Sequence, residues 1–332
     1  MISSTDFIKL PHSPELTEGG IAYATRSLAR SFDLQSGSYH TRLIRIVAEV
    51  GVELAFRRYL HTINTPFEVK GSLPFSEPDH YDVNLGGHRC NLHTFLISNR
   101  SQIAILRNNP DVLLKTPALL REEEFTSDSH NPNELHIFAF LLGLTTNSPV
   151  DTRKALGKAQ RTYLIHPLRS EWSHPQVWAP LGKLMLKSEC SSPVRIEIGG
   201  LDIDRNFINE TLTLEPLTRT FASNEYYSLA FVHIDSHPNA RLGFHNPIKS
   251  ETYLIQPHEW SNIWVYGLEI WLAGYLTQAE FRRKADTSFT GSLIFQYSKT
   301  RTKNLSVPVS NLRPLENLFE QVKKWEEGKS KW

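Results

Sequence analysis

The hydrophobic and polar positions of the first 60 residues follow a helical period. Between residues 39 and 60 apolar side chains recur every three or four positions, as in a helix with one buried face. A shorter helical pattern covers 17–29, where Thr17 precedes a polar first turn. In the longer helix Glu49 and Glu53 lie one turn apart on one side. The sequence therefore predicts two N-terminal helices, the second of which carries a pair of carboxylates.

After residue 60 the pattern changes to that of strands. Short apolar segments separated by Pro, Gly, Asn and Ser predict strands at 67–69, 81–85, 89–97 and 135–142. Gly86 and Gly87 mark a turn between the second and third of these segments. Helices followed by strands favour a mixed α/β core.

The next hundred residues have a different character. Short alternating segments with frequent turn residues predict strands at 195–198, 211–214, 226–234 and 240–244. Their spacing favours a β-sandwich-like unit. The predicted organisation is a first core part at 1–150, an inserted β-rich domain at 151–258 and a return to the core at 259–332.

The returning part begins with a strongly apolar strand at 264–273. Thr277-Gln278-Ala279-Glu280 is a capping box that opens a helix through Lys284. A strand is predicted at 293–303. The chain then ends in an amphipathic helix, whose apolar face is formed by Leu315, Leu318, Phe319, Val322 and Trp325.

Composition limits the classes of function. A length of 332 residues suits two compact units, and a net charge of +1 gives no overall attraction to a polyanion or a membrane. Nucleic-acid binding would therefore need local patches. Two cysteines, Cys90 and Cys190, are too few for a disulfide framework and favour a cytoplasmic protein. No secretion signal is visible, and no apolar stretch reaches the roughly 20 residues of a bilayer span, so no membrane association is expected.

The candidate chemistry lies around the predicted strands at 81–85 and 89–97. Asp82 is on the first strand, and Asn91 and His93 share one face of the second because alternate strand residues point the same way. The order of a helix with Glu49 and Glu53, Asp82, a glycine turn, this strand and the apolar strand at 134–142 resembles the core of the PD-(D/E)xK restriction-endonuclease-like superfamily. The resemblance implies an α/β fold with a restriction-endonuclease-like mixed-sheet core and an inserted β-sandwich-like domain.

The resemblance also implies a site for Mg²⁺, held by Asp82 together with a helix carboxylate, Glu49 or Glu53. Asn91 and His93 stand where the family has an acid and a lysine. A neutral carboxamide is a weaker Mg²⁺ ligand than a carboxylate, and histidine lacks the permanent charge of lysine. If the chain cuts, His93 acts near the attacking water and Asn91 orients it. The substitutions favour weakened or lost cleavage.

The expected function is thus a DNA-binding, nuclease-like protein, and the family implies a defence, restriction or mobile-element setting. Less specific interpretations stay open beside it. Glu49 and Glu53 could be a solvated helix face paired with arginines, Asp82 could approach a hairpin turn, and His93 could be structural.

Basic residues near the C-terminus offer a DNA-binding surface. In the predicted strand at 293–303, aromatic rings and cations alternate onto one face, and the preceding helix adds three cations. These residues are Phe295, Tyr297, Lys299, Arg301 and Lys303, with Arg282, Arg283 and Lys284. The alternative is an edge strand protected by charge.

Aromatic residues of the β-rich segment support a competing function. Trp172, Trp178, Tyr226 and Tyr227 are either core residues or a binding platform. In the second case the protein is a non-enzymatic binding or scaffold module that holds a protein or carbohydrate partner. A homodimer is compatible with either function.

Overall fold

The computed structural model describes residues 2–29, 38–69, 83–125, 131–146, 148–297 and 299–329. The chain forms two units, which are described separately. The first comprises Met1–Gly20, Ala48–Leu144 and Tyr266–Trp332, and the second comprises Ile21–Val47 and Thr145–Val265. The predicted mixed α/β class with an added β-rich region is confirmed.

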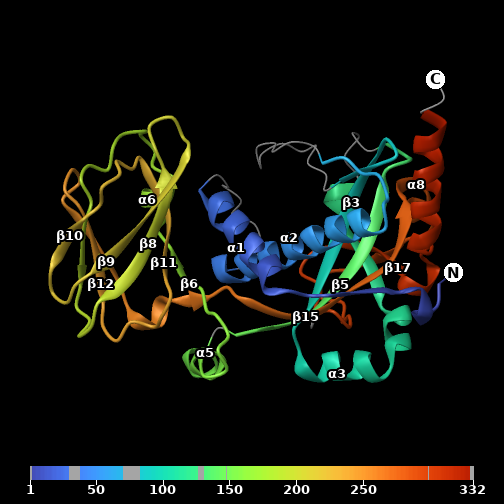
Figure 1. Cartoon of the computed structure of the whole chain (residues 1–332), viewed down its shortest axis with the longest axis horizontal. Helices are drawn as coiled ribbons and strands as arrows, with labels where there is room; N and C mark the ends of the chain where they lie inside the picture. Colours follow the sequence, from blue (N-terminus) through green and yellow to red (C-terminus); the bar gives the residue numbers. More distant parts are fainter. Residues whose placement is uncertain are drawn as a thin grey trace. The chain divides into compact units, whose positions relative to one another are not determined.

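A five-stranded mixed sheet lies at the centre of the first unit (Figure 1), in the order β1-β15-β5-β3-β2. Its strands are β1 (Ile8–Pro11), β2 (Val83–Leu85), β3 (His88–Ile97), β5 (Leu135–Thr145) and β15 (Val265–Thr277). β1 is antiparallel to β15, whereas β3 and β5 are parallel and paired without a shift from Cys90↔Leu135 to Ile97↔Leu142.

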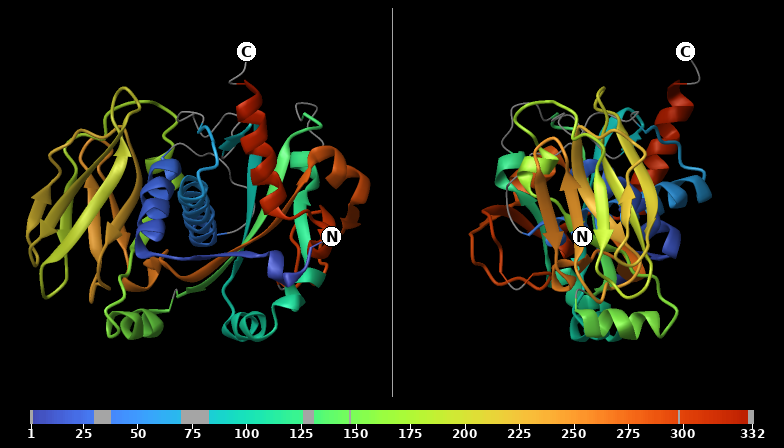
Figure 2. Two further views of the ribbon diagram at one scale, coloured as in Figure 1. Left: turned by 45° about the vertical axis from the view of Figure 1, so that its right-hand side comes forward. Right: turned by 90° about the vertical axis from the view of Figure 1, so that its left-hand side faces the viewer.

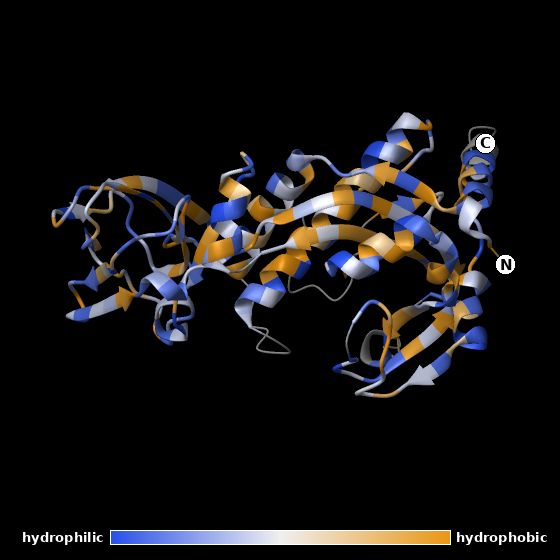
Figure 3. Ribbon diagram, turned by 90° about the horizontal axis from the view of Figure 1, so that it is seen from below, coloured by the Kyte–Doolittle hydropathy of each residue, from blue (hydrophilic) through white to orange (hydrophobic). Residues whose placement is uncertain are grey.

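The two longest apolar segments of the sequence form β5 and β15, as predicted. The first nine residues of β5 are all buried, which is the pattern of a strand covered on both faces. Apolar residues, orange in Figure 3, accordingly run along the long strands of this sheet. Of the predicted strand at 81–85, residues 83–85 form β2, and Asp82 lies outside the described residues.

The predicted helices at both ends of the sequence are confirmed. They are α1 (Pro14–Leu28), α2 (Tyr39–Thr62) and α8 (Leu315–Lys329). In α8 the side chains of Leu315, Leu318, Phe319 and Val322 are buried, as its amphipathic pattern predicts.

α2 packs on α8, and α8 packs on the β2–β3 turn. The ring of Phe319 lies 6.3 Å from that of Phe56 and 6.0 Å from that of Tyr59. Trp325 meets His88, with ring centroids 4.8 Å apart. At Gly86, where φ is +60°, a Cβ atom would lie 2.4 Å from the Trp325 ring, so the turn needs glycine for both its backbone angle and its space.

The opposite side of β3 and β5 faces a separate apolar core. This core contains alternate residues of the two strands, among them Phe95, Phe138 and Phe140. It is completed by α3 (Arg100–Asn108), α4 (Glu122–Phe125), α7 (Gln278–Lys284) and a three-stranded sheet. The three strands are β16 (Asp286–Ser288), β17 (Asn304–Pro308) and β4 (Pro117–Arg121), in that order across the sheet.

The prediction of a strand at 293–303 is wrong. Residues 289–297 and 299–303 belong to no helix or strand, and we call this segment between β16 and β17 loop 289–303. Its residues Phe295, Tyr297, Lys299, Arg301 and Lys303 therefore do not alternate along one strand face. Gly291 adopts a φ of +88°, and the loop closes on itself through bonds from Gly291 N to Thr300 O (2.8 Å) and from Thr300 N to Ser292 O (3.0 Å). These internal bonds use backbone groups that a strand would pair with a neighbour.

The predicted capping box at the start of α7 is confirmed. Thr277 Oγ1 accepts a hydrogen bond from Glu280 N, and Glu280 Oε2 accepts one from Thr277 N, each at 3.2 Å. The box satisfies two backbone donors that the first turn of a helix leaves without partners.

Thr277→Ala is therefore expected to lower the free energy of unfolding by about 1 kcal/mol. Urea denaturation followed by circular dichroism measures the change. Thr290→Ala, at an exposed site of the same unit, serves as the control and should change stability by less than about 0.5 kcal/mol. Equal losses in the two variants would show that the cap contributes nothing.

Two antiparallel sheets make up most of the second unit (Figure 2). The order of one sheet is β10-β7-β12-β13 and that of the other is β14-β6-β11-β8-β9. The bounds are β6 (Leu164–Pro167), β7 (Met185–Ser188), β8 (Val194–Leu201), β9 (Phe207–Leu214), β10 (Arg219–Phe221), β11 (Ser228–Ile234), β12 (Leu242–Asn246), β13 (Glu251–Ile255) and β14 (Ser261–Asn262). The short helices α5 (Pro149–Leu156) and α6 (Ser170–Ser173) accompany them.

Both sheets contribute to one apolar core, which supports the sandwich-like prediction. Ile196 and Val232 come from one sheet, and Leu186 and Phe244 from the other. All four strands predicted in this segment are present. Both cysteines are buried, and neither forms a disulfide bond. No helix among the described residues is long and apolar enough to cross a membrane.

Candidate functional site

A pair of histidines lies where the parallel strands β3 and β5 run side by side. His93 Nε2 is 2.9 Å from His136 Nδ1, and His136 Nε2 is 2.6 Å from Oε1 of Gln278, the first residue of α7. An amide oxygen only accepts, so His136 holds its proton on Nε2 and its Nδ1 accepts from His93. Three elements are thereby connected through side chains.

Asn91 joins this arrangement through Glu134. Asn91 Nδ2 donates to Glu134 Oε1 at 2.5 Å, and Glu134 is almost fully buried just before β5. The backbone oxygen of Glu134 accepts from Gln278 N at 2.8 Å. We call Asn91, His93, Glu134, His136 and Gln278 the polar cluster.

The surroundings of the polar cluster are apolar and positively charged. The His93 ring stacks on Phe138 at 5.3 Å, and the His136 ring lies 6.3 Å from Phe281. Burial, and then the proximity of His136 and Arg121, hold the pKa of His93 well below its usual value. His93 is therefore neutral at pH 7 and donates a hydrogen bond without carrying charge.

This shift predicts a pH-dependent stability. The pKa of His93 is lower in the folded than in the unfolded chain, where it is about 6.5, so protons bind preferentially to the unfolded chain. The contribution is fully present above pH 6.5 and is lost as the pH falls below that value. Urea midpoints measured from pH 8 to pH 5 should fall more steeply for the natural chain than for His93→Gln. Histidines that do not contact His93 contribute equally to both proteins, and coincident pH profiles would contradict the assignment to His93.

The remaining predicted ligands are placed differently. Glu53 forms an ion pair with Arg57, one turn along α2. α2 packs on α8, and α8 contacts His88 of β3. His88 and His93 are five residues apart in this strand, so their side chains project from opposite faces. Glu53 thus belongs to a part-buried ion pair within α2, and the role of Glu49 or Glu53 as a metal ligand stays a prediction.

The polar cluster does not fit Mg²⁺. Mg²⁺ needs octahedral oxygen ligands at short distance, whereas the cluster offers histidine nitrogens already joined to each other and one carboxylate already bound to Asn91. Across the described ranges, which leave out Asp82, no three His, Cys, Asp or Glu side chains are grouped to hold a metal ion. The polar cluster itself is a hydrogen-bonded set, and the Mg²⁺ site that involves Asp82 stays a prediction.

Cations adjoin the polar cluster at the end of β4. Arg121, the last residue of β4, lies close enough to His93 to lower its pKa, and it pairs with Asn304 of β17. Lys303 directly precedes β17 and forms an ion pair of 2.6 Å with Glu122. The basic loop 289–303 therefore returns to the sheet beside the cluster.

The cations of α7 have separate neighbours. The Arg282 guanidinium lies 5.7 Å from the Phe125 ring, and Lys284 Nζ donates to Asn311 O at 3.0 Å. Arg283 is exposed, as are Lys299 and Arg301 of the loop.

Sequence reasoning placed Asn91 and His93 on one face and missed their partners. One signal was available: Glu134 and His136 repeat the spacing of Asn91 and His93, a polar residue followed two positions later by histidine. In the parallel pairing Asn91 lies opposite His136 and His93 opposite Phe138, so each polar residue of β3 contacts a side chain two residues back along β5, and the equal spacing repeats that contact.

Comparison with protein-family models, curated proteins and solved structures gives no match. The case for a function therefore rests on the geometry of the polar cluster and its neighbours.

Proposed function

We propose that this protein binds DNA on a nuclease-like core and does not cleave it through a divalent metal ion. The observation that supports this most is the polar cluster. Asn91 and His93, which stand where the resemblance to the PD-(D/E)xK superfamily expects an acid and a lysine, are hydrogen-bonded to Glu134 and His136, and His93 is neutral with Arg121 beside it. The N–H groups of His93 and His136 are already used within the cluster, and a set of side chains held in this way supplies no metal-bound water to attack a phosphate.

DNA would be held by the exposed cations around loop 289–303. Lys299 and Arg301 are exposed, and Tyr297 is 40% exposed with its ring set edge-on against Phe95 at 6.3 Å. A tyrosine fixed in this way can stack on a base, while the cations pair with phosphates. Arg282 and Arg283 of α7 would pair with further phosphates in the same way.

DNA affinity is expected to fall linearly, on logarithmic axes, with salt concentration. Each phosphate contact contributes about 0.9 to the slope, so Lys299→Ala and Arg301→Ala should each reduce the slope by about 1. Fluorescence anisotropy with a labelled duplex measures the slope between about 50 and 300 mM KCl, a range over which each phosphate contact changes the affinity about fivefold. Arg195→Ala, an exposed arginine of β8, is the matched control and should leave the slope unchanged. Unchanged slopes in both loop variants would exclude the loop as the DNA contact.

Cleavage is tested with the same protein. Supercoiled plasmid incubated with Mg²⁺ or Mn²⁺ should stay intact. Nicking that disappears in Asp82→Ala would overturn the non-cleaving part of the proposal and leave the DNA-binding part standing.

A second candidate function, recognition of a carbohydrate or protein by the β-rich unit, is favoured by one surface feature. Trp172 and Tyr226 are core residues, as the simpler interpretation predicted, but Trp178 and Tyr227 are partly exposed, with ring centroids 5.6 Å apart. The guanidinium of Arg205 lies 4.9 Å from the Trp178 ring. Binding to a glycan array that is lost in Trp178→Ala, together with no DNA affinity, would favour this function over the first.

A further inference from the structure

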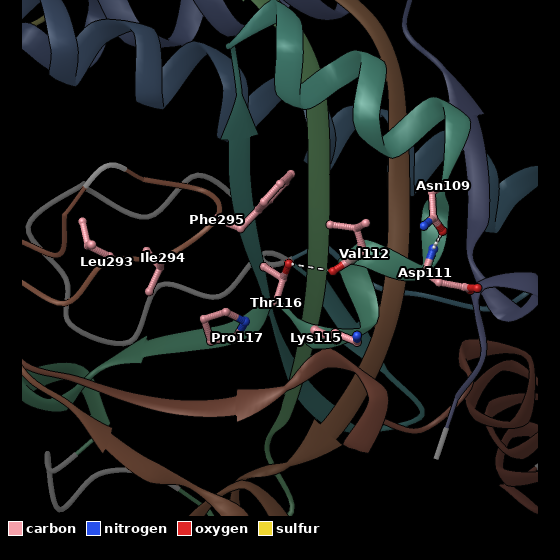
Figure 4. A pocket seen from close by; sticks show the side chains of 9 residues that line it. All are labelled: Asn109, Asp111, Val112, Lys115, Thr116, Pro117, Leu293, Ile294 and Phe295. Carbon is pink, nitrogen blue, oxygen red and sulfur yellow. Dashed lines mark hydrogen bonds between the residues drawn. The ribbon is translucent and has the colours of Figure 1, made fainter.

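A pocket of about 420 Å³ opens in the first unit (Figure 4). One side is formed by the short helix at Pro110–Lys115 and the start of β4, and the other by residues 293–295 of loop 289–303. Its volume is in the range that holds a small organic molecule. It is distinct from the polar cluster, whose residues do not line it.

The walls of the pocket are mainly apolar. Val112 and Pro117 stand on one side, and Leu293, Ile294 and Phe295 on the other. Leu293 is 79% exposed, the most exposed large apolar residue among those described. An apolar side chain held open to water beside a concave apolar wall is stabilised when a ligand covers it.

The loop that carries this wall is held in place by hydrogen bonds from other elements. Gln102 Nε2 of α3 donates to Phe295 O at 2.6 Å, and Gln296 Nε2 donates to Pro117 O. The closing bonds between Gly291, Ser292 and Thr300 fix the base of the loop. The pocket is therefore preformed, which lowers the entropic cost of binding.

The two charged side chains of the pocket, Asp111 and Lys115, differ in their hydrogen bonding. Asp111 Oδ1 accepts a hydrogen bond from Ser4 Oγ at 2.5 Å. Lys115, in contrast, has no hydrogen-bond or ion-pair partner for its side chain within the described parts of the chain. The pocket thus combines apolar walls with a carboxylate that is hydrogen-bonded to Ser4 and a lysine that can pair with a negatively charged ligand.

We propose that this pocket binds a small aromatic carboxylate. Phe295 and Pro117 provide flat surfaces for a ring system, Leu293 and Val112 cover its edges, and Lys115 pairs with the carboxylate. One or two fused rings suit the volume. The pocket shares loop 289–303 with the proposed DNA surface but is not lined by its cations, and it does not involve the polar cluster.

The test uses 2-naphthoate as the probe and isothermal titration calorimetry on the full chain. The natural protein should bind it, and Lys115→Met, which keeps the apolar stem but removes the charge, should weaken binding about threefold to fivefold, as expected for an exposed ion pair. The neutral analogue 2-naphthalenemethanol should bind the natural protein and Lys115→Met equally. Lys158→Met, an exposed lysine of the second unit, is the matched control and should behave as the natural chain does.

Leu293→Asp provides the independent variant, because an exposed residue tolerates the change and the new carboxylate repels the probe. The lost apolar contact and the new repulsion together should weaken binding about tenfold, while the circular dichroism spectrum stays unchanged. No binding of 2-naphthoate to the folded natural protein, or equal binding to Leu293→Asp, would overturn the proposal. Equal binding to Lys115→Met would overturn the choice of an anion.

Discussion

Phe281→Ala is expected to lower the free energy of unfolding by about 3–5 kcal/mol. Phe281 of α7 is fully buried, and its ring lies 5.7 Å from that of Phe125, 5.8 Å from that of Phe138 and 6.3 Å from that of His136. Truncation removes apolar contacts and leaves a cavity where α4, α7 and β5 meet. Since such a cavity collapses only partly, the cost exceeds the transfer free energy of the ring alone.

Urea denaturation gives the magnitude, and hydrogen exchange of peptides covering 131–146 and 278–285 gives the location. Phe289→Ala is the matched control, because the same atoms are removed from a side chain that is 67% exposed. It should change stability by less than about 0.5 kcal/mol. Faster exchange around Gln278 in Phe281→Ala would also show that this ring holds the polar cluster together. Equal effects of the two variants would contradict the central place given to Phe281.

The second large effect is expected at Gly200 in the β-rich unit. A Cβ atom there would lie 2.1 Å from Ser228 O and 2.9 Å from Tyr226 Cδ1. The first of these atoms belongs to the backbone of the neighbouring chain segment, so it cannot turn aside as a flexible side chain would. Gly200→Ala should therefore lower the free energy of unfolding by about 1–3 kcal/mol through overpacking.

Gly157→Ala separates this steric cost from the general effect of adding a methyl group. Gly157 ends α5 with φ −62° and ψ −16°, and its nearest contact would be Arg153 O at 3.5 Å. This substitution should be neutral or slightly stabilising. A matching loss in both variants, read from urea midpoints, would show that the close approach at Gly200 is relaxed without cost.

Much of the fold could be predicted because its signals are local. The continuous apolar segment from Leu135 encodes a strand buried on both faces, and Thr277 with Glu280 encodes the start of a helix within four residues. Loop 289–303 could not be predicted in this way. Its alternation matches a strand, but its conformation depends on Gln102, which donates to Phe295 O from nearly two hundred residues away.

The candidate site, too, could be predicted from the sequence only in part. The common face of Asn91 and His93 follows from strand geometry. Their partners Glu134 and His136 follow only from the parallel pairing of β3 with β5, and Gln278 is added by a helix beyond the whole β-rich segment. Asn91 and His93 are thus held by contacts that no short stretch of sequence encodes.

The position of β15 between β1 and β5 affects how the nascent chain can assemble. Because Ile8 pairs with Leu272, the N-terminal strand leaves the ribosome about 260 residues before its partner does. The strands of the β-rich segment are all synthesised before that point. A polypeptide truncated before residue 265 would therefore leave β1 and β5 each with an open edge where β15 would pair. Open strand edges favour aggregation, so chaperone binding to the nascent chain would be an advantage.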